Sequence, residues 1–318
     1  MKKGVVIGFD TSNYTTSVAL ISEDGELVAN IKRPLPVKAG ERGLRQSDAL
    51  FAHIKNLPDA ISEAEEYLKD TNLIAVGVSE RPRNLDGSYM PCFLAGISAA
   101  CSVKAAAGIQ ISKYSHQCGH IAAAIYSSGN LDLLNKPFAA FHVSGGTTEL
   151  LSVNRVENGF FADHIGGTRD LNAGQVIDRI GVAMGLPFPA GPHIEKLASE
   201  NTKKIPKRKI SRDGLWLNLS GLENICLKLY KDTDDKALVS AFVLEYIASA
   251  LLELSLEYMK LHGDAHFVFA GGVMSNSIIK AKLSANLDCS FAEPSMSADN
   301  AVGIAYLTLL EYKKRHGE

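Results

Sequence analysis

The feature that most constrains the fold is a pair of strand-turn-strand signals, one near the N-terminus and one near the middle of the chain. The first covers residues 5–20 and the second covers residues 138–151. In each, an apolar run enters a turn rich in Gly, Ser and Thr and leaves as a second apolar run, the pattern of a β-hairpin. Because glycine permits close backbone approach and hydroxyls add donors, two such turns are suited to clamp a phosphate chain. Ordinary hairpin chemistry explains either turn taken alone.

Length and charge restrict the class of protein. A chain of 318 residues exceeds what one core usually serves, so we expect two domains, residues 1–110 and 111–318. The formal net charge of −2 provides no bulk attraction to nucleic acid. A polyanion partner would therefore need a local patch. The basic segment 203–212 is a candidate, although such runs also occur as solvated loops.

Cysteine content and hydropathy predict the compartment. The five cysteines form no CxxC pair, which favours free thiols in a reducing environment. The N-terminus lacks the pattern of a signal peptide, and no run has the eighteen or so uncharged apolar residues of a membrane span. We therefore expect a cytoplasmic protein without a membrane partner.

Periodicity along the chain predicts an α/β fold built from a duplicated unit. In the first part it indicates a strand at 26–33, one or two helices at 47–68 broken near Pro58, a strand at 73–79 and a helix at 94–108. In the second part it indicates helices at 177–184, 235–262 and 298–314 and a strand at 265–270. Two such units with a nucleotide in the cleft between them form the plan of the actin, sugar kinase and Hsp70 superfamily.

A histidine pair suggests a metal site. His116 and His120 are four residues apart, so on a helix both imidazoles lie on one face and can bind one metal ion. The alternative is a pair of helix-terminal histidines without a ligand. A zinc protease is a weaker hypothesis, because Gln117 stands where the HExxH mechanism needs a carboxylate.

Taken together, these and further motifs resemble the family of tRNA threonylcarbamoyladenosine-synthesis proteins, formerly labelled O-sialoglycoprotein endopeptidases. The resemblance covers nearly the whole chain. It rests on the order and spacing of the matching stretches, which are 8–12, His116 with His120, 143–150, 170–178, 185–192, 219–222, 270–276 and 299–301.

The resemblance implies a set of site residues. The metal, iron or zinc, would be bound by His116, His120 and Asp299. Asp299 can also be explained as a helix N-cap. The adenine nucleotide or acyl-adenylate would be bound by residues of four stretches, namely Asp10, Thr11 and Ser12; His142, Val143, Ser144, Gly145 and Gly146; Asp178 and Gly191; and Gly271, Gly272 and Asn276.

It also implies a reaction and its partners. Members transfer a threonylcarbamoyl group from its adenylate to the N6 amine of the adenosine beside the tRNA anticodon, together with partner subunits of a tRNA-modification complex. A divalent metal ion would polarise the carbamoyl carbonyl. No covalent protein intermediate is needed, so none of the cysteines is expected to act as a nucleophile.

Several positions depart from the family pattern. Asn13, Tyr14 and Thr15 replace a Cys-Asp-Glu sequence in the first turn, and Arg81-Pro82-Arg83 replaces a Gly-Pro-Gly turn ahead of an unusual segment at 84–91. In the central motif an acidic pair is reduced to Asp170-Leu171, and Gln175 replaces a glutamate. These changes leave two alternatives open: a paralogue that carbamoylates or acylates another acceptor, and a non-catalytic assembly subunit.

Overall fold

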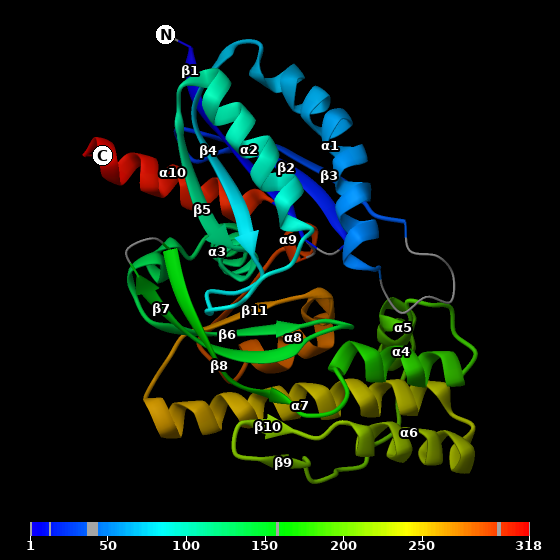
Figure 1. The fold of residues 1–318 in the computed structure, drawn as a ribbon. Coiled ribbons are helices and arrows are strands. Elements are labelled where there is room, and N and C mark those ends of the chain that lie inside the picture. The colour runs from blue at the N-terminus through cyan, green and yellow to red at the C-terminus, as the bar shows by residue number, and fades with distance from the viewer. Residues whose placement is uncertain (1, 13, 37–43, 157–158, 298–299, 318) are drawn as a thin grey trace. The chain divides into compact units, whose positions relative to one another are not determined.

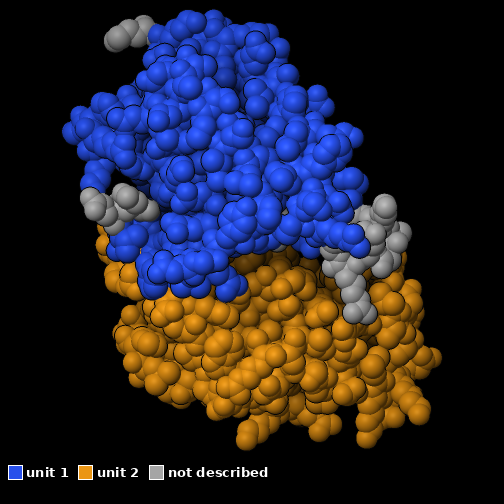
Figure 2. Space-filling view, viewed as in Figure 1, with its two compact units in different colours: residues 1–134, 155–162, 295–318 blue, residues 135–154, 163–294 orange. Residues whose placement is uncertain are grey.

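The computed structural model describes residues 2–12, 14–36, 44–156, 159–297 and 300–317. By contact density the chain forms two compact units, coloured separately in Figure 2. Unit 1 comprises residues 1–134, 155–162 and 295–318, and unit 2 comprises residues 135–154 and 163–294. The C-terminal segment therefore belongs with the N-terminal unit. The proposed domain division after residue 110 stays a prediction, because contact density does not test independent folding.

Unit 1 contains a five-stranded sheet with strand order β3-β2-β1-β4-β5 (Figure 1). Strands β1, β2 and β3 form an antiparallel meander, which confirms the predicted first hairpin, and β4 and β5 run parallel to β1. The strand bounds are β1 Lys3–Thr11, β2 Thr15–Ser22, β3 Leu27–Pro34, β4 Thr71–Arg81 and β5 Gln110–Ser115.

Helices cover both faces of this sheet. Val5, Ile7 and Phe9 point into a core shared with residues of α1 and α2, whereas Gly8, on the opposite face of β1, contacts α10. Asp10, two residues after Gly8, lies on the same face of β1 as Gly8. The helix bounds are α1 Gln46–Leu68, α2 Phe93–Ala107, α3 His116–Ser128, α9 Pro294–Ser297 and α10 Val302–His316, with a 3-10 turn at Leu131–Asn135.

The expected break near Pro58 is wrong, because α1 is one continuous helix with this proline inside it. Pro58 is exposed, so the carbonyl that loses its helical donor can be hydrated. On the opposite side Leu57, Ala60 and Ala64 are buried against the sheet. Packing of that face outweighs the unfavourable local effect of proline.

Unit 2 contains a seven-stranded sheet with strand order β12-β11-β6-β7-β8-β10-β9. Strands β6 and β7 are antiparallel, which confirms the predicted second hairpin, and β11 runs parallel to both β6 and β12. The strand bounds are β6 Phe138–Val143, β7 Thr148–Val156, β8 Gly159–Thr168, β9 Arg212–Asp213, β10 Trp216–Leu217, β11 Phe267–Ala270 and β12 Cys289–Phe291.

The core of unit 2 is built around the long helix α7, Lys236–His262. This helix is long and apolar enough to cross a membrane by length and composition, but 72% of its most apolar window is buried inside the protein, as in the core helix of a globular unit. The other helices are α4 Ala173–Ala183, α5 Gly191–Ser199, α6 Ser220–Thr233 and α8 Ser277–Ser284, with a 3-10 turn at Gly272–Ser275. The predicted helix at 298–314 corresponds to α10, and residues 298 and 299 lie outside the described residues.

Candidate functional site

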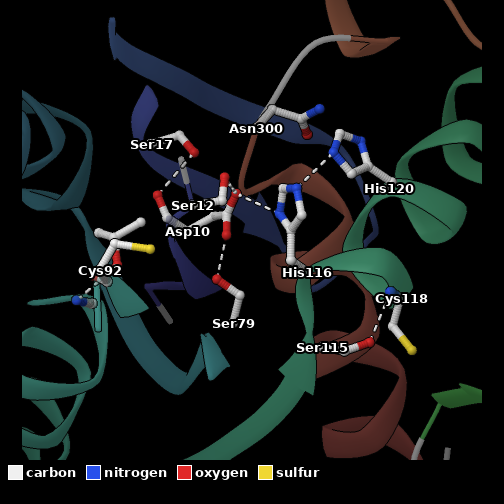
Figure 3. Close-up of polar contacts among 12 residues, drawn as sticks. Asp10, Ser12, Ser17, Ser79, Cys92, Ser115, His116, Cys118, His120 and Asn300 are labelled. Atoms are coloured by element: carbon white, nitrogen blue, oxygen red, sulfur yellow. Dashed lines mark hydrogen bonds and ion pairs between the residues drawn. The ribbon is translucent and has the colours of Figure 1, made fainter. Parts of the chain in front are cut away.

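A buried carboxylate at the end of β1 organises the polar centre of unit 1 (Figure 3). The Asp10 side chain is fully buried, and its Oδ1 accepts a short hydrogen bond from the Ser79 hydroxyl on β4. Its Oδ2 accepts from Ser12 Oγ at 3.0 Å and lies 3.0 Å from His116 Nδ1. Burying a charge is costly unless it is hydrogen-bonded, and these three contacts meet that requirement.

The two predicted histidines lie together at the start of α3. Ser115 caps this helix, its hydroxyl accepting from the Cys118 amide, so His116 occupies the first helical position and His120 follows one turn later. The two Nε2 atoms are 2.9 Å apart. An ionised carboxylate only accepts hydrogen bonds, so Asp10 places the ring proton of His116 on Nδ1. The other ring nitrogen of His116, Nε2, faces His120 (Figure 3).

This donor set fits a metal ion. Two imidazole nitrogens bound to one zinc ion at about 2.0–2.1 Å lie roughly 3.3 Å apart, close to the observed separation. A carboxylate that accepts from the remote nitrogen of a ligating histidine is the usual outer-shell support. Within the described residues no group of three His, Cys, Asp or Glu side chains surrounds a common point. The predicted third ligand, Asp299, lies outside those residues, so the three-ligand site stays a prediction.

Thr11 and Ser12 are buried beside Asp10 and make internal contacts. Thr11 Oγ1 donates to the Cys92 carbonyl and accepts from the Gly96 amide, each at 3.0 Å. Thr11 therefore anchors the start of α2 to β1. Sequence reasoning assigned these hydroxyls to substrate, and it gave no signal for this anchoring role.

The segment that departs from the family pattern lies against the histidine helix. The Pro82 carbonyl accepts from the Gln117 amide at 3.1 Å, so the Arg81–Arg83 turn satisfies one donor at the N-terminus of α3. Asn84 Nδ2 donates to the Phe160 carbonyl at 2.7 Å and lies 3.2 Å from Cys118 Sγ. These replacements thus take part in holding the helix that bears His116.

In unit 2 the predicted phosphate loop is the turn between β6 and β7. Ser144 Oγ accepts from the Gly146 and Thr147 amides at 3.2 and 3.1 Å. The Ser144 amide donates to the Thr147 carbonyl at 2.7 Å, which closes the turn. The Ser144 hydroxyl, predicted to face a phosphate, therefore binds two amides of its own turn.

The start of α4 packs directly on this turn. The Gly174 amide donates to the Ser144 carbonyl at 3.2 Å, and the Ala173 amide donates to Thr148 Oγ1 at 2.9 Å. A Cβ at position 174 would lie 2.7 Å from the Gly145 nitrogen, so only glycine permits this approach. The turn consequently lies at the positive end of the α4 dipole, where an anion is stabilised.

Open space adjoins several of the predicted glycines. A Cβ added at Gly145, Gly146, Gly191 or Gly272 would meet no atom within 4 Å. Gly271 differs, because its φ is 104° and a Cβ there would lie 2.3 Å from the Val143 carbonyl oxygen. The ends of β6 and β11 are thus brought together at Val143 and Gly271, with His142 paired to Ala270 in register.

Two predicted nucleotide contacts also have internal partners. Asp178 Oδ1 accepts from the Ala190 amide at 2.8 Å, which ties α4 to the chain entering α5. Asn276 caps α8, its Oδ1 accepting from the Ile279 amide at 3.0 Å. Glu195 Oε1 accepts from the next amide along, that of Ser277, at 2.7 Å. These contacts hold the side chains in place, and their roles toward a nucleotide stay predictions.

The fold defines the class of protein first. The structure aligns with component A of (R)-2-hydroxyglutaryl-CoA dehydratase from Acidaminococcus fermentans at a TM-score of 0.53 and 15% identity, over 98% of this chain and 99% of that one. It aligns with a ROK family glucokinase from Streptomyces griseus at a TM-score of 0.51 and 12% identity, over 96% and 99% of the two chains. The chain is thus an α/β protein of the actin-like ATPase and sugar kinase fold.

Sequence comparison then identifies the family. The family model of tRNA N6-adenosine threonylcarbamoyltransferase matches residues 37–306. Proteins of that name from Streptococcus pneumoniae (strain Taiwan19F-14) and Streptococcus suis (strain 05ZYH33) are 29% and 30% identical, each over 99% of this chain and 95% of the relative. The chain belongs to the tRNA N6-adenosine threonylcarbamoyltransferase family, and membership places it among enzymes. The resemblance deduced from the motifs is confirmed.

Proposed function

We propose that this protein transfers a threonylcarbamoyl group from threonylcarbamoyl-adenylate to the N6 amine of the adenosine next to the anticodon of tRNA, in a metal-dependent reaction. Family membership supports tRNA modification over transfer to another acceptor. The proposed metal dependence rests on one observation: the His116 and His120 Nε2 atoms lie 2.9 Å apart, and Asp10 contacts His116 Nδ1.

The metal ion, iron or zinc, would be held by His116, His120 and Asp299. When bound, it would supply a Lewis acid that polarises a carbonyl oxygen of the transferred group. Asp10 fixes the tautomer and orientation of His116 through Nδ1, and Ser79 and Ser12 fix Asp10. The protein's own contribution here is a donor pair whose geometry is set by buried hydrogen bonds.

The adenylate would be held by unit 2. The Ser144–Gly146 turn, with open space beside Gly145 and Gly146 and the α4 N-terminus behind it, suits the phosphate. At the adenosine end, Asp178 uses one carboxylate oxygen for the Ala190 amide, so its Oδ2 is available to a ribose hydroxyl. Open space beside Gly191 and Gly272 allows the backbone there to approach the nucleoside. Asn276 directly follows the 3-10 turn Gly272–Ser275.

The test is transfer of labelled threonine, through enzymatically generated threonylcarbamoyl-adenylate, onto unmodified tRNA in the presence of the partner subunits we expect. We predict incorporation by the wild-type protein and its loss in His116→Ala. The matched control is His316→Ala, an exposed histidine in the last turn of α10, which should retain full transfer. Undiminished transfer by His116→Ala would overturn the metal-dependent mechanism, and absence of transfer by the wild type would overturn the proposed reaction.

A further inference from the structure

A dense basic segment in unit 2 has no role in the site described above. Between Lys203 and Lys209, five of seven residues are Lys or Arg and none is acidic. Lys203 is paired with Asp235 at 2.6 Å. The remaining four are exposed, and their side chains form no ion pair or hydrogen bond with the part of the chain that the structure describes; they are Lys204, Lys207, Arg208 and Lys209.

The backbone of this segment is fixed at both ends although it forms no helix or strand. At its start the Lys203 amide donates to Asn201 Oδ1 at 3.2 Å, and Asn201 Nδ2 donates back to the Lys203 carbonyl at 2.8 Å. At its end Ile210 is buried, and the Ser211 amide donates to the Tyr246 hydroxyl of α7 at 3.0 Å. Anchoring of this kind lowers the ordering cost when a ligand binds.

The surroundings leave the positive charge uncompensated. Lys207 and Arg208 line a cavity of about 660 Å³, and Glu245 and Glu253 also line it. Lys282 Nζ donates a short hydrogen bond to Glu245 Oε1, and Arg212 Nε forms an ion pair with Glu253 Oε2 at 3.1 Å. The carboxylates near the segment thus have cationic partners of their own. The chain has a formal net charge of −2, yet these four cationic side chains have no ionic partner among the residues that the structure describes.

We propose that the segment 203–209 binds the phosphate backbone of tRNA. This inference rests on the proposed function for the identity of the polyanion. Several exposed cations on a stretch of backbone anchored at both ends can contact phosphates together, and such contacts provide affinity by releasing counterions rather than by reading bases.

The test compares two triple variants in binding to a fluorescent, unmodified tRNA transcript between 50 and 200 mM KCl. Lys207→Gln/Arg208→Gln/Lys209→Gln removes three charges from the segment. Its control, Lys196→Gln/Lys228→Gln/Lys231→Gln, removes three exposed lysines of α5 and α6. We expect the first variant to lower the slope of log Kd against log salt by about 2 to 3 and to weaken binding about ten- to a hundredfold at 100 mM KCl.

The control variant should retain a slope close to that of the wild type, and both variants should melt at the wild-type temperature. Equal slopes and affinities for all three proteins would overturn the inference, as would no measurable binding by the wild type. Different outcomes refute the proposed transfer reaction and the proposed role of the segment 203–209. Altered binding without any transfer by the wild type would refute the reaction alone, whereas unaltered binding with normal transfer would refute the role of this segment alone.

Discussion

The packing between α3 and α10 yields a prediction about the helix that bears the histidine pair. Position 303 on α10 lies directly against the backbone of α3. A Cβ added there would be 1.8 Å from the Gly119 carbonyl oxygen and 2.7 Å from the Ala123 nitrogen. On its other side α10 contacts β1, where a Cβ at Gly8 would lie 2.7 Å from the Ala305 nitrogen. Because α10 contacts α3 on one side and β1 on the other, it cannot move away from α3 without displacing β1.

The change Gly303→Ala requires backbone to move by more than about 1 Å to restore an ordinary contact distance. Overpacking in a core typically costs 1–3 kcal/mol, and here no flexible side chain can give way, so the upper part of that range applies. The higher helix propensity of alanine returns about 1 kcal/mol. The net fall in the free energy of unfolding is therefore expected to be about 1 to 2 kcal/mol, which corresponds to roughly 2 to 8 °C in melting temperature for a unit of this size.

Thermal denaturation followed by circular dichroism measures this effect, with Gly221→Ala as the matched control. Gly221 lies in the first turn of α6, and a Cβ there would meet no atom within 4 Å. The control should melt at the wild-type temperature or slightly above it. If Gly303→Ala and Gly221→Ala melted together, the close approach of α3 and α10 would be refuted.

Three further predictions concern titration, thiol reactivity and the buried carboxylate. Desolvation opposes ionisation of Asp170, but hydrogen bonds from the first turn of α6 lower its pKa from 3.8 to about 2. The pKa of Asp170 is lower in the folded than in the unfolded state, so this stabilisation is complete above pH 4 and is lost as the pH falls toward 2. Urea midpoints of the wild type should therefore drop more steeply over that window than those of Asp170→Asn. Parallel curves for the two proteins would contradict the stabilising role of the Asp170 carboxylate. Burial raises the pKa of Cys92 to about 11, so a maleimide at pH 7.5 should label exposed Cys101 well before Cys92, and equal rates would contradict the burial. Asp10→Asn should lower the free energy of unfolding by about 1.5–3 kcal/mol and zinc affinity about 10- to 100-fold, measured by chemical denaturation and calorimetry; unchanged affinity would mean that Asp10 does not orient His116.

Much of the fold follows from local sequence signals. Both hairpins have β-branched or apolar runs on either side of turn residues, so their strands appear where predicted. The His116 helix was also predictable, because Ser115 is a strong N-cap and small residues follow it. In both cases the determining interactions are made within a few residues.

Other features depend on long-range contacts that local patterns do not reveal. Pro58 remains inside a helix because the opposite face is buried against the sheet. The return of α10 to unit 1 depends on contacts with strands far away in sequence. At the candidate site, Ser144 binds the amides of its own turn, and Asp178 binds the Ala190 amide. Hydroxyl and carboxylate side chains serve ligands or backbone equally well, and only the tertiary structure shows which backbone groups they meet.

The proposed transfer to the tRNA adenosine is tested most directly by comparing two tRNA transcripts as acceptors for labelled threonylcarbamoyl groups. One carries adenosine next to the anticodon, and the other carries guanosine at that position and is otherwise identical. We predict incorporation into the first transcript alone, with the label recovered on the adenosine N6 by nucleoside mass spectrometry. Equal incorporation into both transcripts, or none into either, would contradict the proposed transfer.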